Sequence, residues 1–412
     1  MTNKIHMPLL NGIVQALVFT FKENQHAEKA LEKIFKSNRK LGGRDRRFIA
    51  SNFYNIVRHW RRVLYVLGIQ WKDNETLDLS ENDYHKICAF WIYKEGHPLP
   101  GQFEDDEQRF EEMLAQYNSL DKSKLIKEKE STPNWLNEMG QKEFSDRWPQ
   151  VVSAMNHQAP IYLRTNILKT TTDDLKNQMD SEEISTEKMV VDKDLSLLKV
   201  KIRKNVFQTQ AFKKGHFEVQ DGGSQQIAPF CQVAPKMKVV DACAGAGGKS
   251  LQLGTLMKNK GKLIALDIHE WKLNELKKRA ARNNIDVIET HLANSKRIKK
   301  LKGMADRLLL DVPCSGLGVL KRSPDTKWKM SPARIEELKE IQKTILFDYS
   351  KMVKVGGKLI YATCSIFPDE NERQVAKFLE ANPDWTLEAE QTLLPSKQPF
   401  DGFYMARLIR NS

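Results

Sequence analysis

The chain has 412 residues, of which 40% are hydrophobic, 29% charged and 8% aromatic, and at roughly 150 residues per domain this length predicts two or three domains with apolar cores. Lys and Arg outnumber Asp and Glu by 66 to 53, and the resulting net charge of +13 favours a polyanionic partner such as nucleic acid. The five cysteines form no Cys-x-x-Cys pair, which argues against a disulfide framework or a zinc module and fits a reducing compartment.

The first predicted element is an amphipathic helix over residues 7–21, where apolar side chains recur at helical spacing. No cleavage site of small residues follows this stretch, and it falls short of the ~18 apolar residues that a membrane-spanning helix needs. We therefore expect a soluble, cytoplasmic protein that has no membrane partner.

Further helices are predicted over residues 27–35 and 44–67, and the chain up to about residue 130 is expected to form an all-α domain. Residues 1–66 contain 13 Lys and Arg against 4 Asp and Glu. The excess lies mainly in Arg39, Lys40, Arg44, Arg46, Arg47, Arg58, Arg61 and Arg62. Such a basic face can bind the phosphates of a nucleic acid, or it can be an ordinary solvated helix face, and charge alone leaves both interpretations open.

Residues 131–230 are predicted to hold linker helices and a small α+β platform. Strand-type alternation over residues 163–168 is followed by a helical segment at 172–179 and by strand segments at 188–191 and 197–202. The order strand, helix, strand, strand predicts an RRM-like platform of about 80 residues.

From residue 231 to residue 412 the pattern changes to strands that alternate with helices. Strands are predicted at 239–240, 263–266, 308–310 and 359–362, and the main helices at 270–282 and 332–353. This alternation predicts an α/β domain with a mostly parallel, doubly wound Rossmann-like sheet, in which ligands bind at the carboxyl ends of the strands. A glycine turn, two aspartates and two cysteines follow these strands, so the sequence predicts one site at that edge.

The turn over residues 241–250 reads Asp-Ala-Cys-Ala-Gly-Ala-Gly-Gly-Lys-Ser and lies between a strand and a helix, where its glycines allow backbone N–H groups to approach a ligand. A P-loop needs glycine where Cys243 stands, and the dinucleotide pattern fails because Lys249-Ser250 stands where its last glycine belongs, so an adenosyl ligand without a pyrophosphate is favoured. Asp267, at the end of the next strand, is either the carboxylate for the ribose hydroxyls or a helix cap. Asn294 is either a contact to the adenine edge or a turn residue.

Two cysteines follow neighbouring strands, in the motifs Asp311-Val-Pro-Cys-Ser-Gly and Tyr361-Ala-Thr-Cys-Ser. Adjacent strands lie about 5 Å apart, so Cys314 and Cys364 can face one pocket beside the glycine turn. Carbon 5 of a pyrimidine is too weak a nucleophile to take a methyl group from S-adenosyl-L-methionine, but a thiolate that adds at carbon 6 turns the ring into an enamine that can. Asp311 can hydrogen-bond the amine or ring nitrogen 3 of a cytosine. This chemistry does not decide which cysteine adds to the ring and which assists product release.

Together, the glycine turn and the two cysteine motifs resemble those of the Sun-type RNA 5-methylcytosine methyltransferases, in particular their RsmB-like bacterial branch. Three upstream motifs extend the resemblance: Ser131-Thr-Pro-Asn-Trp-Leu, Ala159-Pro-Ile-Tyr-Leu-Arg-Thr-Asn and Phe217-Glu-Val-Gln-Asp-Gly-Gly-Ser-Gln. The resemblance covers nearly the whole chain. It implies a Rossmann-like class I methyltransferase domain over residues 231–412, preceded by the platform over 131–230 and by a NusB-like RNA-binding domain over 1–130.

The resemblance also implies roles for single residues. Cys364 is implied as the nucleophile and Cys314 as the group that assists product release, with Asp311 and Lys249 completing the catalytic set. The expected cofactor contacts are Cys243, Ala244, Gly245, Ala246, Gly247, Gly248, Lys249, Asp267, Asn294 and Asp311. The chain departs from the family where Cys-Ala-Gly-Ala-Gly-Gly-Lys replaces the usual Cys-Ala-Ala-Pro-Gly-Gly-Lys, and where Asn294 replaces a common aspartate.

We therefore expect an S-adenosyl-L-methionine-dependent RNA cytosine-C5 methyltransferase that acts on ribosomal RNA as a monomer, on a base that has left the helical stack. No metal is expected, because the nine histidines show no ligand spacing. Two other functions stay open: a tRNA methyltransferase, or a catalytically silent RNA-binding factor in ribosome assembly, which the departures at Ala246 and Asn294 allow. The segment 322–328 is either a surface that stacks on RNA or a packed loop anchored by Trp328.

Overall fold

The computed structural model divides into two compact units. It describes residues 6–73, 77–99, 101–192 and 195–412. Unit 1 is formed by Met1–Gln158 and Leu320–Pro332, and unit 2 by Ala159–Val319 and Ala333–Ser412. A segment from far along the chain therefore belongs to the N-terminal unit. The predicted boundaries of three domains stay a prediction.

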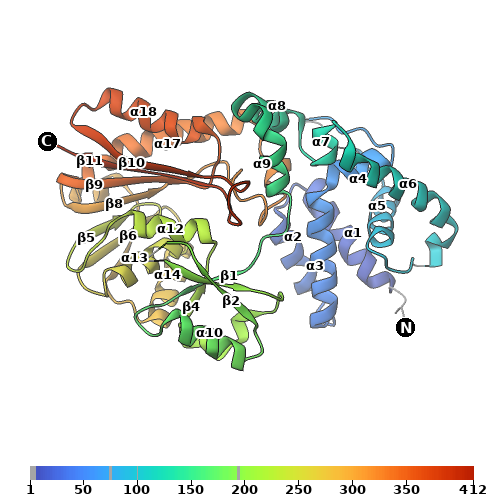
Figure 1. Ribbon diagram of the computed structural model, residues 1–412, viewed down its shortest axis with the longest axis horizontal. Helices are drawn as coiled ribbons and strands as arrows, with labels where there is room; N and C mark the ends of the chain where they lie inside the picture. The colour runs from blue at the N-terminus through green and yellow to red at the C-terminus, as the bar shows by residue number, and fades with distance from the viewer. Residues whose placement is uncertain (1–5, 74–76, 100, 193–194) are drawn as a thin grey trace. The chain divides into compact units, whose positions relative to one another are not determined.

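Unit 1 is built from helices (Figure 1). They are α1 (Met7–Phe21), α2 (Ala27–Ser37), α3 (Gly43–Arg58), α4 (Trp60–Val66), α5 (Glu81–Lys94), η1 (Gly101–Asp106), α6 (Glu107–Ser119), η2 (Leu120–Lys122), α7 (Ile126–Lys129), α8 (Asn134–Phe144), η3 (Ser145–Arg147), α9 (Trp148–Met155) and α16 (Thr326–Lys329). The prediction of a single helix over residues 44–67 is wrong in one respect. The backbone leaves helical geometry at His59, with φ −103° and ψ 21°, so two helices replace it.

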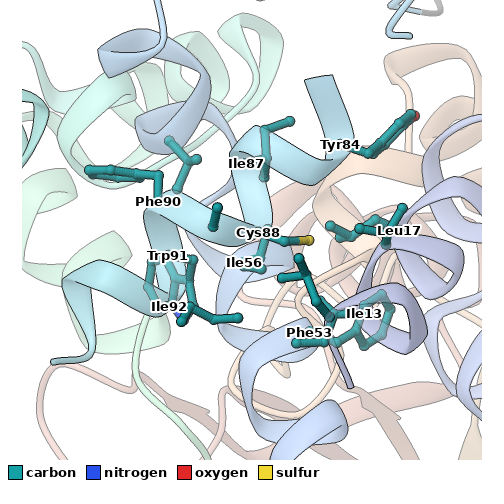
Figure 2. Packing of buried hydrophobic residues seen from close by; sticks show 14 of the residues in the cluster. Ile13, Leu17, Phe53, Ile56, Tyr84, Ile87, Cys88, Phe90, Trp91 and Ile92 are labelled. Atoms are coloured by element: carbon teal, nitrogen blue, oxygen red, sulfur yellow. The ribbon is translucent and has the colours of Figure 1, made fainter. Parts of the chain in front are cut away.

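The core of unit 1 forms where α1, α3 and α5 pack together. Ile13 and Leu17 of α1, Phe53 and Ile56 of α3, and Cys88 of α5 are all fully buried, and Figure 2 shows them converging. Each helix presents one apolar stripe to this core, as its periodicity predicts. Burial raises the pKa of the Cys88 thiol well above its ordinary value, so this cysteine serves as an apolar core residue.

Three arginines of the expected basic face are internal. Arg58, Arg61 and Arg62 keep only 4–6% of their surface exposed. Arg61 donates to the carbonyl oxygen of Thr132 at 2.9 Å and to the Glu128 carboxylate at 2.8 Å. The interpretation of these three side chains as phosphate ligands is wrong, because each is buried and donates to acceptors within unit 1.

The remaining basic residues of that region stay available to solvent. Arg39, Lys40, Arg44 and Arg47 are exposed around the start of α3, and Arg46 is half-buried. Arg46 donates from Nε to the carbonyl oxygen of Leu41 at 3.0 Å. A smaller basic surface than the sequence predicted is therefore left on unit 1.

Unit 2 contains a small antiparallel sheet with the strand order β2-β3-β1-β4. Its elements are β1 (Tyr162–Thr165), α10 (Thr172–Ser181), β2 (Thr186–Val190), β3 (Ser196–Val200), η4 (Val206–Gln208), α11 (Gln210–Lys213) and β4 (Phe217–Val219). The expected order of strand, helix, strand and strand is present. β4 was not predicted, because three residues are too few to show a period of two.

The larger sheet of unit 2 has the order β10-β11-β9-β8-β5-β6-β7. Its elements are α12 (Gly222–Phe230), β5 (Lys238–Asp241), α13 (Gly248–Leu256), β6 (Lys262–Asp267), α14 (Glu270–Asn283), β7 (Ile288–Leu292), α15 (Ser295–Lys300), β8 (Ala305–Asp311), α17 (Pro332–Tyr349), η5 (Ser350–Met352), β9 (Val353–Thr363), η6 (Pro368–Glu370), α18 (Glu372–Ala381), β10 (Trp385–Leu393) and β11 (Phe403–Arg410). Strands β5 to β9 pair in parallel, whereas β11 runs antiparallel to β9 and β10.

Helices cover both faces of this larger sheet (Figure 1). One apolar cluster joins the sheet to α17 and α18, and another joins it to α12, α13 and α14. The chain runs outward from β5 to β7 and then returns to β8 on the other side of β5. This reversal creates a topological switch point between β5 and β8, where ligands of doubly wound sheets bind. The doubly wound fold predicted from the sequence is confirmed. None of the described helices has the length and apolar character of a membrane span.

Candidate active site

The turn after β5 needs its glycines and leaves space beside them. Gly245 and Gly247 have φ values of 54° and 89°, in the left-handed region that favours glycine. A Cβ on Gly247 would lie 2.1 Å from Cδ1 of Leu276, whereas a Cβ on Gly245 or on Gly248 would meet no atom within 4 Å. Gly248 opens helix α13, so backbone N–H groups border this open space. The turn therefore has room for a ligand against its backbone.

Asp267 braces this turn from the end of β6. Its Oδ2 accepts from the backbone N–H of Gly245 at 2.9 Å, and its Oδ1 accepts from the N–H of His269 at 2.8 Å. Each carboxylate oxygen has a second lone pair, which stays usable by a ligand hydroxyl. Asn294 behaves differently, since it is exposed and caps α15 by accepting from the N–H of Arg297 at 2.9 Å.

A buried carboxylate that the sequence did not single out lies under the turn. Asp241 accepts a hydrogen bond from the Ser250 hydroxyl at 2.6 Å, and its Oδ1 has no partner among the described residues. Burial raises the pKa of Asp241 to about 7. Burial also raises the pKa of the Cys243 thiol well above its ordinary value, and the Asp241 carboxylate raises it further. Cys243 therefore stays a neutral thiol.

The two cysteines predicted to share a pocket lie side by side. β8 and β9 are parallel neighbours, with Asp311 opposite Ala362. Cys314 follows Asp311 by three residues and Cys364 follows Ala362 by two. Their sulfur atoms are 3.3 Å apart. Both side chains are half-buried, so neither is enclosed in the apolar core. The backbone N–H of Cys364 also donates to the Cys314 sulfur at 3.3 Å.

The charges around the two thiols differ. The hydrogen bond to Cys364, together with burial, raises the pKa of Cys314 well above its ordinary value, so Cys314 keeps its proton. Lys249 lies 2.6 Å from the Asp311 carboxylate. Burial alone lowers the pKa of Lys249, but Asp311 and the ionised form of Cys364 outweigh burial and raise it. The site thus holds one neutral thiol and one ammonium group beside Cys364.

Glu370 anchors the loop that carries Cys314, and the sequence analysis missed it. This side chain is fully buried. Its carboxylate accepts from the backbone N–H of Ser315 at 2.8 Å, from the Ser315 hydroxyl at 2.5 Å and from Nε2 of Gln342 at 3.0 Å. The only sequence signal is an acidic residue six positions after Cys364, which looks like an ordinary surface residue.

The segment 322–328 takes the packed form of its two predicted alternatives at Lys327 and Trp328. Trp328 donates from Nε1 to the carbonyl oxygen of Val57 at 2.7 Å, and the buried Lys327 ammonium donates to the carbonyl oxygen of Arg58 at 2.8 Å. Burial lowers the pKa of Lys327 well below its ordinary value. In the part of the chain that the structure describes, no three His, Cys, Asp or Glu side chains form a group that could hold a metal ion.

A doubly wound sheet with a glycine turn after β5 and a carboxylate at the end of β6 defines the class of Rossmann-like domains that bind an adenosine-containing ligand. Solved structures support this class at the level of fold. PH0851 aligns over 100% of both chains with a TM-score of 0.80 and 23% identity. NSun6 from Pyrococcus horikoshii, solved with SFG, aligns over 68% of this chain and 98% of its own with a TM-score of 0.61 and 18% identity.

The sequence comparisons narrow the class to one family. Residues 232–409 match 16S rRNA methyltransferase RsmB/F, and residues 132–199 match the RsmF/B-like ferredoxin-like domain. The probable ribosomal RNA small subunit methyltransferase B of Synechocystis sp. is 33% identical over 312 residues, which are 71% of this chain and 70% of that protein. Ribosomal RNA small subunit methyltransferase B of Shewanella oneidensis is 34% identical over 68% of this chain and 67% of its own.

The chain therefore belongs to the RsmB/F family of ribosomal RNA methyltransferases. The family resemblance seen in the motifs is confirmed. The structure brings Lys249, Asp311, Cys314 and Cys364 together at the carboxyl ends of β8 and β9 and beside the glycine turn. Their roles stay a prediction.

Proposed function

We propose that the chain transfers a methyl group from S-adenosyl-L-methionine to carbon 5 of a cytosine in ribosomal RNA, through a covalent bond between Cys364 and carbon 6. The observation that carries this proposal is the 3.3 Å separation of the Cys314 and Cys364 sulfurs, beside the Lys249–Asp311 ion pair. Addition of a thiolate to the cytosine ring requires that the target nucleotide leave its stack, because carbon 6 is otherwise out of reach.

The electron balance of the reaction fits two thiols. The Cys364 thiolate adds to carbon 6 of the ring, and the electron pair of the 5,6 double bond moves to carbon 5. When bound, S-adenosyl-L-methionine supplies a sulfonium methyl group to that carbon. A base then removes the proton from carbon 5, the double bond re-forms, and the bond between Cys364 and carbon 6 breaks.

The electrostatics of the pair favour Cys364 as the nucleophile. Because Cys314 keeps its proton, its S–H group can donate to the Cys364 sulfur and stabilise the thiolate that must add to the base. The Lys249 ammonium group contributes in the same direction, since a cation stabilises a neighbouring thiolate. Cys314 then remains beside the adduct for the release step, where its thiol can position the water molecule that removes the proton from carbon 5.

Asp311 is suited to hold the cytosine. Its Oδ2 is occupied by Lys249, yet 28% of its side chain is exposed, so the carboxylate can also accept from the exocyclic amine of the base. Uracil presents a carbonyl oxygen at that position, which cannot donate. A carboxylate here therefore favours cytosine over uracil.

The turn after β5 supports S-adenosyl-L-methionine as the cofactor. Open space beside Gly245 and Gly248, bordered by backbone N–H groups, suits the donor's methionine and ribose portions. Asp267 has lone pairs left for the ribose hydroxyls. The fold relative NSun6 was solved with SFG, an analogue of S-adenosyl-L-methionine. Asn294 is used as a helix cap, so its contact to adenine is the weakest part of the proposed set.

The experiment combines labelled S-adenosyl-L-methionine, small-subunit ribosomal RNA and three variants. Cys364→Ala should abolish methyl transfer. Cys314→Ser should leave an adduct between protein and RNA that survives denaturing electrophoresis, because the addition proceeds but release fails. Cys231→Ala, a matched change at a cysteine in the core, should transfer normally. Transfer by Cys364→Ala, or label on a base other than cytosine, would refute the proposal.

A further inference from the structure

Unit 1 contains a cavity of about 280 Å³ whose lining includes six aromatic residues. It lies outside the catalytic set and within unit 1 alone, because every lining residue belongs to Thr20–Tyr84, Pro133–Trp135 or the segment Leu320–Pro332. The aromatic lining residues are Phe21, Trp60, Trp71, Tyr84, Trp135 and Trp328. Four of the chain's eight tryptophans thus surround one small volume.

The aromatic wall is fixed in place by hydrogen bonds. Asp73 accepts from the indole N–H of Trp71 at 2.7 Å and from the backbone N–H of Trp135 at 2.8 Å. Trp328 is held by its bond to the carbonyl oxygen of Val57, and its ring lies edge-on to Trp71 with centroids 4.9 Å apart. Rings that are held in this way lose little entropy when a planar ligand stacks on them.

Cations and an unused donor accompany these rings. Lys22 and Lys329 line the cavity, and Lys329 is steered there by bonds to the carbonyl oxygen of Thr20 at 3.0 Å and to Asn24 Oδ1 at 3.1 Å. Trp60 also lines the cavity, and its buried indole N–H has no hydrogen-bond partner among the residues that the structure describes. Stacking faces and cations are what an anionic, planar ligand requires.

We propose that this cavity binds the base of one unpaired nucleotide of the RNA, with the adjoining phosphate near Lys22 and Lys329. The inference rests on the proposed function for its RNA partner. A volume of about 280 Å³ is just below the ~300–1,000 Å³ of pockets for drug-sized ligands, so it suits one base and excludes a double helix. Bases within a helix already stack on their neighbours, and the cavity therefore selects RNA with an exposed base. This site would hold the RNA at a second point, separate from the cytosine that is methylated.

The test measures binding of a labelled oligouridylate, which contains no cytosine, and of a fully paired RNA duplex. Trp71→Ala should weaken oligouridylate binding between about fivefold and about a hundredfold, the range for loss of one stacking ring. Duplex binding should change less than about twofold. Tyr65→Ala removes an exposed aromatic ring of α4 outside the cavity and should leave both affinities unchanged.

Lys22→Ala tests the cation at a solvent-exposed position that cannot affect folding strongly. It should lower the salt dependence of oligouridylate binding by about 0.7 in the log–log slope, whereas the exposed Lys40→Ala should not. Should Trp71→Ala unfold, Trp71→Phe keeps a smaller ring and should bind with intermediate affinity. The proposal would be overturned if Trp71→Ala weakened the binding of single-stranded and of paired RNA equally. Unchanged oligouridylate binding by both the Trp71 and the Lys22 variants would also overturn it.

The result is independent of methyl transfer. If the wild type does not methylate cytosine, but it binds oligouridylate and Trp71→Ala weakens that binding, the proposed function fails and the base site stands. If methylation is normal and the cavity variants bind like the wild type, the base site fails alone. Binding of an aromatic peptide but of no nucleotide would equally refute it.

Discussion

Glu370 should be a positioning residue for the cysteine that assists release. Its carboxylate accepts three hydrogen bonds from Ser315 and Gln342, and it is fully buried. Replacement by Ala removes the acceptor of these three bonds; the Ser315 hydroxyl can still donate to Oγ of Ser365 at 3.3 Å, so two buried donors are left unsatisfied. At about 1–3 kcal/mol for each unsatisfied group, the free energy of unfolding should fall by about 2–5 kcal/mol. Glu370→Gln retains one acceptor oxygen and should cost about 1–3 kcal/mol.

The functional effect should exceed what stability explains. Ser315 follows Cys314 directly, so loss of the anchor lets the Cys314 sulfur move relative to Cys364. A displacement of about 1 Å can slow a chemical step about 100-fold. Because Cys364 directly follows β9, whose pairing with β8 does not involve Glu370, adduct formation should survive in Glu370→Gln while release slows.

The assay compares single-turnover adduct formation with steady-state methyl transfer at a temperature where circular dichroism shows the variant folded. Glu370→Gln should accumulate the adduct between protein and RNA, as Cys314→Ser does, with steady-state turnover about 100-fold lower. The control is Glu128→Gln, which alters a buried carboxylate of unit 1 paired with Arg61 and should lower stability without trapping RNA. Reduced stability with normal turnover and no adduct would show that Glu370 only supports the fold.

Three further outcomes follow from the same geometry. Because the pKa of Asp241 is raised to about 7 from 3.8, the folded chain binds more protons than the unfolded chain between these values, so the free energy of unfolding should fall by up to about 4 kcal/mol as pH rises from about 4 to about 7; denaturant titrations of Asp241→Asn should lack this slope. Gly318→Ala places a Cβ 2.7 Å from the carbonyl oxygen of Cys364 and should lower methyl transfer in the labelled assay, whereas Gly43→Ala, where a Cβ meets nothing within 4 Å, should not. Hydrogen peroxide should oxidise the Cys364 thiol to a sulfenic acid, which the Cys314 thiol then converts to a disulfide with loss of water; transfer should stop and return with dithiothreitol, and mass spectrometry should find the Cys314–Cys364 disulfide, which Cys314→Ser cannot form.

The parts of the site that sequence alone located are those set by strand position. Strand alternation placed Asp267, Asp311, Cys314 and Cys364 after parallel strands, and the sheet brings the carboxyl ends of parallel strands to one edge. The distance between the sulfurs follows from strand spacing, because β8 and β9 are neighbours. The order of the two cysteines in the reaction does not follow from spacing, since it depends on which thiol keeps its proton.

The same reasoning failed for side chains whose partners are distant in sequence. Arg61 and Arg62 look like solvated cations next to their helical neighbours, yet their acceptors Glu128 and Asp121 lie 67 and 59 residues away. Glu370 reaches Ser315 across 55 residues. A charge pattern read within one helix carries no information on such contacts, so it overstated the basic face and overlooked the anchor of the Cys314 loop.

The segment Leu320–Pro332 shows why the aromatic cavity was only half predicted. Its mixture of cations and an indole was recognised in the sequence, with stacking on RNA and packing as alternatives. Lys327 and Trp328 donate to the backbone carbonyl oxygens of Arg58 and Val57, and carbonyl oxygens have no signature in a sequence because every residue carries one. The two alternatives are nevertheless compatible in one side chain: a Trp328 ring anchored through its N–H group still presents a face to the cavity. Packing of this segment therefore builds the wall on which a base would stack, and the anchor bond is a condition of the proposed binding.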